Sequence, residues 1–305
     1  MEPLWNFLRQ QAAPIRIALF LVALVVLAAP IALPLYWWEY QQPEGHSVIL
    51  APVSLVFVFA ALLFVWAQRV HGLKQPWQVL GFWGGLRWWR TWVQGFAIGA
   101  AGVALLYGLQ LAWGWGDLTL TTISYGRIIL EGLFLALLVG IAEEFIFRGW
   151  LLFELDQDYS PALALWINGF LFAIAHYIRP VSAIVETWPQ FLGLWLLGLT
   201  LVWARRTPVR LEAEIEAQRK NQRQHQRSRT SLANAAGLHG GLVWAYYQVT
   251  VAGLVTPTGA VPPWISGIQG NPLAGVMGAG LLGGIAAIFY YRSHTATPPT
   301  QPQSR

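Results

Sequence analysis

The chain has 305 residues, of which 56% are hydrophobic and 11% are charged, and it contains no cysteine. Its apolar residues fall in long runs rather than in alternating or amphipathic patterns, so the composition predicts a multi-span membrane protein. The lack of cysteine excludes a disulfide framework and a thiolate site. The net charge of +5 does not indicate a nucleic-acid partner, because the basic residues lie in loops between apolar runs.

Eight apolar segments are expected to cross the bilayer as helices, since about 20 residues span its hydrocarbon core. We therefore predict an all-α fold, a polytopic membrane helical bundle of about eight transmembrane helices. The expected spans are 15–36, 47–68, 91–113, 126–153, 160–178, 188–204, 231–254 and 272–291.

The basic residues predict the orientation of this bundle. With the N-terminus in the cytoplasm, 16 of the 19 Lys and Arg residues lie on the inner side; the other three are Arg127 and Arg179 outside and Arg148 within a span. The positive-inside rule then gives an N-in/C-in topology in a plasma membrane or equivalent inner membrane. An odd number of spans would break this partition.

Three further segments have compositions that predict their location: the first span and two basic segments. The first span could be read as a secretory signal, but it is longer than an apolar h-region of about 7–15 residues, so we expect a retained helix. Residues 69–90 mix tryptophan with basic residues, which is typical of a segment at the headgroup level. Residues 205–230 form a basic cytoplasmic loop without aromatic residues to stack on bases, so we expect anionic lipid rather than nucleic acid beside it.

The predicted organisation has three parts, and the last ends in a proline-containing tail that we expect to be disordered. They are 1–124 with spans one to three, 125–254 with spans four to seven, and 255–305 with the last span and the tail 293–305.

Two carboxylates and a guanidinium interrupt the apolar run of span four. Glu144 and Arg148 are four residues apart and lie on one helix face, where they can pair. Glu143 is turned by about 100° from Glu144 and cannot share Arg148 equally well. Ionisable groups at this depth are costly and are functional candidates. We expect Glu144 to be held as an ion and Glu143 to be free to exchange protons.

Spans five and seven each contain one imidazole, at His176 and His239. A single buried histidine is more often a core residue than a catalyst. Burying two of them together with Glu143, Glu144 and Arg148 without function would be costly. We predict that the three spans bring these side chains to a common wet pocket in the inner half of the bilayer.

Two motifs in this region give the sequence a resemblance to a known family. E-E-x-x-x-R is present as Glu143, Glu144 and Arg148, and F-x-x-x-H as Phe172 and His176. The sequence resembles the CPBP (CAAX protease and bacteriocin-processing) intramembrane proteases, also called Abi proteins or type II CAAX prenyl endopeptidases, which include Rce1.

The third family motif, H-x-x-x-N or H-x-x-x-D, is met only at His239, because Val243 takes its last position. In the family that amide or carboxylate would help to hold the oxyanion. Asn168 and Asn234 are the candidates to replace it.

The resemblance implies a role for each site residue. Glu143 would be the base that takes a proton from water, His176 would position that water, and His239 would stabilise the tetrahedral oxyanion. Glu144 and Arg148 would form the scaffold. If the family's metalloprotease label applies, a divalent ion such as Zn²⁺ would be held by Glu143, His176 and His239. The sequence leaves open whether the water is held by a metal or by Glu and His.

Glycines 237, 240 and 241 keep span seven narrow, so that either a neighbouring helix or a substrate backbone can approach it.

We therefore predict an intramembrane endopeptidase that hydrolyses a membrane-associated peptide, of prenylated CAAX type or a leader peptide. Two alternatives stay open. One is a catalytically inactive membrane scaffold or immunity protein, which the Val243 departure favours. The other is a proton-coupled transporter that uses the buried carboxylates and imidazoles as a relay.

Overall fold

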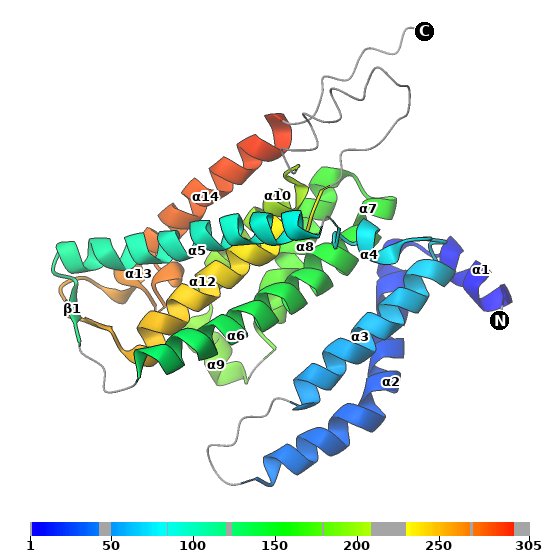
Figure 1. Cartoon of the computed structure of the whole chain (residues 1–305), viewed down its shortest axis with the longest axis horizontal. Coiled ribbons are helices and arrows are strands. Elements are labelled where there is room, and N and C mark those ends of the chain that lie inside the picture. The colour runs from blue at the N-terminus through cyan, green and yellow to red at the C-terminus, as the bar shows by residue number, and fades with distance from the viewer. Residues whose placement is uncertain are drawn as a thin grey trace, which may run out of the picture. The chain divides into compact units, whose positions relative to one another are not determined.

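The computed structural model describes residues 2–42, 50–83, 85–119, 124–178, 180–208, 230–268 and 271–295 (Figure 1). Most of these residues are helical. The only strands among them are β1 (Gly116–Leu118) and β2 (Val255–Pro257), which pair antiparallel with Asp117 opposite Thr256. The predicted all-α class is confirmed apart from this short ribbon.

The helices lie close to the apolar segments that the sequence predicts. They are α1 (Glu2–Gln10), α2 (Ala13–Tyr40), α3 (Leu50–Arg69), α4 (Pro76–Val79), α5 (Leu86–Ala112), α6 (Tyr125–Glu144), the π-helix η1 (Phe145–Leu151), α7 (Leu152–Asp158), α8 (Pro161–Ala175), α9 (Val181–Thr187), α10 (Gln190–Arg206), α12 (Ala233–Ala252), α13 (Pro263–Ser266), the 3-10 helix η2 (Pro272–Ala274) and α14 (Val276–Thr295).

The predicted number of membrane crossings is supported only in part. Among the described helices, α2, α3 and α5 are long and apolar enough to cross a membrane, and the pair α9 and α10, bent by 81°, would make a fourth. Each predicted span overlaps a helix, but eight crossings are not confirmed. For span five the reason is length: the 15 residues of α8 rise by about 1.5 Å each and fall short of a core of about 30 Å.

Several sequence predictions concern regions that the described residues cover only in part. Residues 209–229 of the basic loop, residues 296–305 of the tail, and Arg179 lie outside the described residues. The N-in/C-in orientation and the headgroup position of residues 69–90 stay predictions.

The chain divides into two compact units. The first comprises Met1–Leu80 and Trp150–Ser160, and the second comprises Gly81–Gly149 and Pro161–Arg305. These units are defined by which residues pack together, whereas the predicted boundaries after residues 124 and 254 are based on the motifs. Those boundaries stay a prediction.

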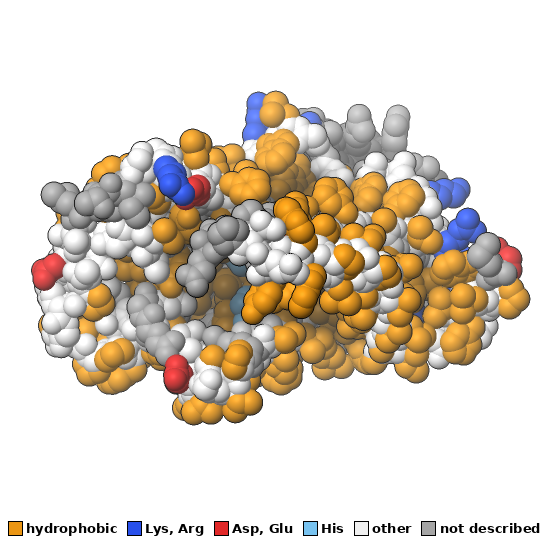
Figure 2. All heavy atoms as spheres, turned by 90° about the horizontal axis from the view of Figure 1, so that it is seen from below, with side chains coloured by type: hydrophobic (Ala, Val, Ile, Leu, Met, Phe, Trp, Pro, Cys, Tyr) orange, Lys and Arg blue, Asp and Glu red, His pale blue; other side chains and the backbone are white. Residues whose placement is uncertain are grey.

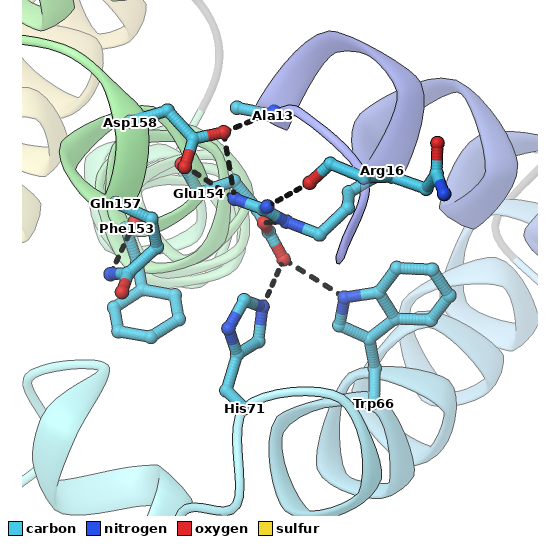
Figure 3. Close-up of polar contacts among 9 residues, drawn as sticks. Ala13, Arg16, Trp66, His71, Phe153, Glu154, Gln157 and Asp158 are labelled. Atoms are coloured by element: carbon cyan, nitrogen blue, oxygen red, sulfur yellow. Dashed lines mark hydrogen bonds and ion pairs between the residues drawn. The ribbon is translucent and has the colours of Figure 1, made fainter. Parts of the chain in front are cut away.

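A buried carboxylate joins three segments of the first unit (Figure 3). Glu154 of α7 is fully buried and accepts hydrogen bonds from Arg16 Nε of α2 at 2.8 Å and from Trp66 Nε1 of α3 at 2.9 Å. His71 Nε2, just beyond α3, lies 2.7 Å from the same carboxylate. Because an unpaired buried carboxylate would be costly, these donors make its burial tolerable and tie α2, α3 and α7 together.

The second unit is organised around α12, which lies beside α5 and α6 (Figure 1). Close approach is possible because glycines face the neighbouring backbones. A Cβ at Gly95 of α5 would lie 2.6 Å from the Asn234 carbonyl oxygen, and one at Gly240 would lie 3.0 Å from the Ala136 carbonyl oxygen of α6. A Cβ at Gly237 or Gly241 would overlap the backbone of α5. The three glycines of α12 therefore serve helix packing rather than a substrate backbone.

Hydrophobic side chains cover much of the surface. Figure 2 shows them over much of the face that it draws, with few charged side chains among them. In the first unit, Val25, Leu33 and Phe57 are each more than 60% exposed. Apolar surface of this extent marks an interaction with a membrane or another apolar partner. Together with the apolar helices, it indicates an integral membrane protein.

Candidate active site

The two adjacent glutamates lie at the end of α6, where the helix changes to the π-helix η1. Arg148, within η1, donates from Nη1 to Glu144 Oε1 at 2.8 Å, and both side chains are fully buried. The predicted Glu144–Arg148 pair is therefore confirmed. A second guanidinium nitrogen, Nη2, donates to the Gly198 carbonyl of α10 at 3.0 Å.

His239 of α12 contacts the carboxylate of this ion pair. Its Nδ1 lies 2.9 Å from Glu144 Oε1. Because a carboxylate that also accepts from Arg148 acts as an acceptor, Nδ1 carries the hydrogen and Nε2 faces away from Glu144. That second nitrogen lies 3.9 Å from Glu143 Oε2. Glu144 thus sets the tautomer of His239 and aims its free nitrogen at Glu143.

His176 lies one residue beyond the end of α8 rather than in the middle of a span. Its Nδ1 lies 2.8 Å from the Phe172 carbonyl oxygen, which can only accept, so Nδ1 donates and Nε2 is left free. Nε2 lies 3.8 Å from Glu143 Oε2. Both free imidazole nitrogens therefore converge on one carboxylate oxygen.

That oxygen, Glu143 Oε2, is buried and has no hydrogen-bond partner among the described residues. The distances of 3.8 and 3.9 Å are too long for direct hydrogen bonds, and separations of this size are those a bridging water fills. Three atoms with lone pairs facing one point need a proton, a water molecule or a cation between them. The arrangement can therefore hold and polarise a water molecule.

The site residues differ in how far their side chains are exposed. The side chains of Glu143 and His176 are 31% and 32% exposed, whereas those of Glu144 and Arg148 are fully buried and that of His239 is 6% exposed. The side chains of Glu143 and His176 are thus partly open to a substrate, although Glu143 Oε2 itself is buried, and the ion pair that orients His239 is shielded.

The ring of Phe172 contacts three polar side chains of the site. Its ring centroid lies 4.3 Å from the Arg148 guanidinium carbon, 4.6 Å from the ring of His176 and 5.9 Å from the ring of His239. An aromatic face under a buried guanidinium compensates part of its lost hydration. Phe172 is therefore in contact with the site, as the second motif predicts.

The two candidate replacements for the third-motif amide lie elsewhere. Asn168 is fully buried, and its Nδ2 donates to the Phe147 carbonyl of η1 at 2.7 Å. The Asn234 backbone packs against Gly95 of α5, and no described contact joins its side chain to the histidines. Val243, one turn beyond His239 on α12, is half-buried. Sequence reasoning missed the Gly198 carbonyl, because a backbone acceptor leaves no residue-type signal.

The predicted zinc ligands lie together, but no group of three or more Asp, Glu or His side chains in the described part of the chain has the arrangement of a metal-ligand set. The divalent ion at Glu143, His176 and His239 stays a prediction, and the chemistry proposed below uses no metal.

Comparison with known proteins supports the resemblance. A family model described as type II CAAX prenyl endopeptidase Rce1-like matches residues 125–214. The match includes the first two motifs and ends before His239. No curated protein and no solved structure gives a significant match to the chain. The chain therefore carries an Rce1-like domain at residues 125–214, and the predicted resemblance to the CPBP family is confirmed.

Proposed function

We propose that the protein is an intramembrane endopeptidase that hydrolyses a peptide bond with a water molecule activated by Glu143 and His176. The observation that carries the proposal is the convergence of the free imidazole nitrogens of His176 and His239 on the unpartnered oxygen of Glu143. The Rce1-like domain supports the same class of hydrolase.

The proposed reaction follows from these positions. Glu143 takes a proton from the water while the water oxygen attacks the carbonyl carbon of the peptide bond. His239 takes up a second proton from solvent at Nε2 before the attack, and the buried Glu144 carboxylate stabilises the imidazolium. Its Nε2–H group then donates to the oxyanion that forms. The proton held by Glu143 then passes to the leaving amine as the C–N bond breaks. Water is thus divided between a new carboxyl group and a new amino group.

The substrate class follows from the family and from the apolar surface. A peptide that reaches Glu143 must lie in or on the bilayer, so we propose a membrane-associated peptide, of prenylated CAAX type or a leader peptide. If the N-in orientation holds, the site opens toward the cytoplasmic half of a plasma membrane or equivalent inner membrane. No nucleic acid takes part.

The proposal is tested by peptide cleavage in proteoliposomes. We expect the wild-type protein to cleave a fluorescent farnesylated CAAX peptide or a leader peptide from a panel, and His176→Ala to lose at least about 100-fold in kcat, as removal of a general acid–base group does. His294→Ala, which changes an exposed histidine at the end of α14, is the matched control and should keep its turnover. Equal turnover in wild type and His176→Ala would reject the proposal.

The same assay addresses the predicted ion. Because the water is proposed to be held by Glu143 and the histidines, incubation with a chelator followed by desalting should leave kcat unchanged. Loss of turnover that added Zn²⁺ restores would replace this part of the proposal with the metal-held water.

A further inference from the structure

We infer that Asn168 is a positioning residue for the proposed active site, acting through the backbone of η1 on Arg148. The inference rests on the proposed function, since it assigns Asn168 to the same site. It differs from the role that the sequence suggested, in which Asn168 would replace the third-motif amide.

The first observation is a stripe of three residues that begins on α8. Asn168 and Phe172 are four residues apart and lie on one face of the helix. His176 follows four residues later, one residue beyond the helix end, with its Nδ1 2.8 Å from the Phe172 carbonyl oxygen. Each contacts a different part of the site. Asn168 donates to the backbone of η1, Phe172 lies against the Arg148 guanidinium, and His176 faces Glu143. The stripe extends the F-x-x-x-H motif by one helical turn.

The second observation is the π-helix that the stripe contacts. η1 covers Phe145–Leu151, directly after Glu144, and it contains Arg148. π-turns are rare, and an unfavourable backbone conformation persists only where its surroundings hold it. The Asn168 amide supplies such a hold, because its Nδ2 lies 2.7 Å from the Phe147 carbonyl oxygen, one residue before Arg148.

The third observation is that packing alone does not explain an asparagine at position 168. It is fully buried, and its Oδ1 has no hydrogen-bond partner in the part of the chain that the structure describes. A buried acceptor without a partner is destabilising, and leucine, of similar size, would avoid it. The residue is therefore explained better by what its N–H group holds than by the space that it fills.

The effect reaches the reacting groups through two hydrogen bonds. η1 sets the position of the Arg148 guanidinium, which donates to Glu144 Oε1, and the same oxygen accepts from His239 Nδ1. If η1 returns to an α-helical turn, the guanidinium shifts, and Glu144 no longer holds His239 with Nε2 toward Glu143. Small displacements of this kind reduce turnover without removing a catalytic group.

Two variants and a matched control test the inference in the full-length protein. Asn168→Leu removes the donor, and Asn168→Asp removes it at nearly the same shape. Thr200→Val on α10 is the control: Thr200 is also fully buried, and its hydroxyl donates only to the Leu196 carbonyl of its own helix. The measurements are kcat and KM per folded protein in proteoliposomes, and the ¹⁵N imidazole signals of His239.

We expect Asn168→Leu to lower kcat by about 10- to 100-fold with little change in KM, and to shift the His239 signals. The ratio of the kcat of Asn168→Asp to that of the wild type should rise as the pH falls, because a protonated carboxyl can again donate to the Phe147 carbonyl. Thr200→Val should keep both kcat and the His239 signals.

Two results would overturn the inference while the proposed function stands. One is a wild-type kcat with unchanged His239 signals in Asn168→Leu. The other is a loss of turnover that matches the loss of folded protein, without the pH-dependent recovery in Asn168→Asp. If the wild-type protein cleaves no substrate, the proposed function fails, and the His239 signals alone still decide whether Asn168 sets the position of the imidazole.

Discussion

Glu143 and Glu144 are adjacent in sequence but have opposite surroundings. Glu144 Oε1 accepts from both Arg148 and His239 in a fully buried position. Glu143 is turned away by about 100° on the same helix, and its Oε2 has no hydrogen-bond partner among the described residues. One carboxylate is therefore held by two donors, and the other has an oxygen that no described donor reaches.

The buried ion pair gives a prediction about stability. Arg148→Met removes the main counter-charge of a fully buried carboxylate, so the free energy of unfolding should fall by about 3–5 kcal/mol. The measurement is denaturant unfolding in detergent. The double variant Glu144→Gln/Arg148→Met, which leaves no buried charge at either position, should recover most of the loss. A single variant as stable as wild type would show that the pair is not needed for the fold.

Residue spacing predicts some of these contacts and misses others. The Glu144–Arg148 pair follows from their i, i+4 spacing, which survives the change from α-helix to π-helix. The grouping of Glu143, His176 and His239 could be predicted, because burying each of these side chains without a polar neighbour would be costly. The η1 turn and the Gly198 carbonyl could not be predicted, because neither a hydrogen-bond register nor a backbone acceptor depends on a distinctive residue type.

At the scale of helices, the contact between α8 and α10 depends on two glycines. A Cβ at Gly198 would lie 2.8 Å from both the Cα atom and the carbonyl oxygen of Gly169, so Gly198→Ala must push the helices apart. We expect a loss of about 1–3 kcal/mol in unfolding free energy, as for other overpacked sites. Activity should fall as well, since the Gly198 carbonyl holds Arg148.

The control for this prediction lies on α14. A Cβ at Gly283 would meet no atom within 4 Å, so Gly283→Ala should be neutral or stabilising by about 0.5–1 kcal/mol. Similar unfolding free energies for the two variants would show that α8 and α10 are not held at this distance.

The contacts among α2, α3 and α7 should depend on pH. Burial tends to raise the pKa of Glu154, but hydrogen bonds from His71, Arg16 and Trp66 outweigh it and hold the pKa below its ordinary value of 4.5. A lowered pKa in the folded state stabilises the fold above the ordinary value, and this contribution is lost as the pH falls through the folded pKa.

The measurement is the unfolding temperature as a function of pH. Acidification below about pH 4.5 should lower it more in wild type than in Glu154→Gln, which has no carboxyl group to protonate. Glu131→Gln, at a half-exposed surface ion pair, is the control and should follow wild type. Parallel curves for wild type and Glu154→Gln would exclude Glu154 as the titrating group.

The direction of a helix is harder to predict than its existence. Apolar runs located α8 and α10 within a few residues, but they carry no information about the 81° bend between α9 and α10. Pro189 stands at that bend, and a proline restricts the residue before it. A run of apolar residues indicates contact with lipid or a core, not a straight crossing.

At the scale of the whole molecule, composition and apolar helices agree on an integral membrane protein, and residues 125–214 match an Rce1-like family model. The family match ends at residue 214, so it does not include His239. The structure adds this residue to the site through its contacts with both glutamates. The number of crossings stays a prediction of the apolar runs, and the orientation in the membrane stays a prediction of the charge pattern.

The central claim is that Glu143 activates the water and Glu144 holds Arg148 and His239. It is tested most directly by making the same substitution at each glutamate and measuring both kcat and the unfolding temperature. The proposed mechanism predicts that Glu143→Gln abolishes cleavage at an unchanged unfolding temperature, because its buried oxygen has no described hydrogen bond to lose. Glu144→Gln should lower both, because it breaks the contacts with Arg148 and His239. Cleavage by Glu143→Gln at the wild-type rate would contradict the mechanism.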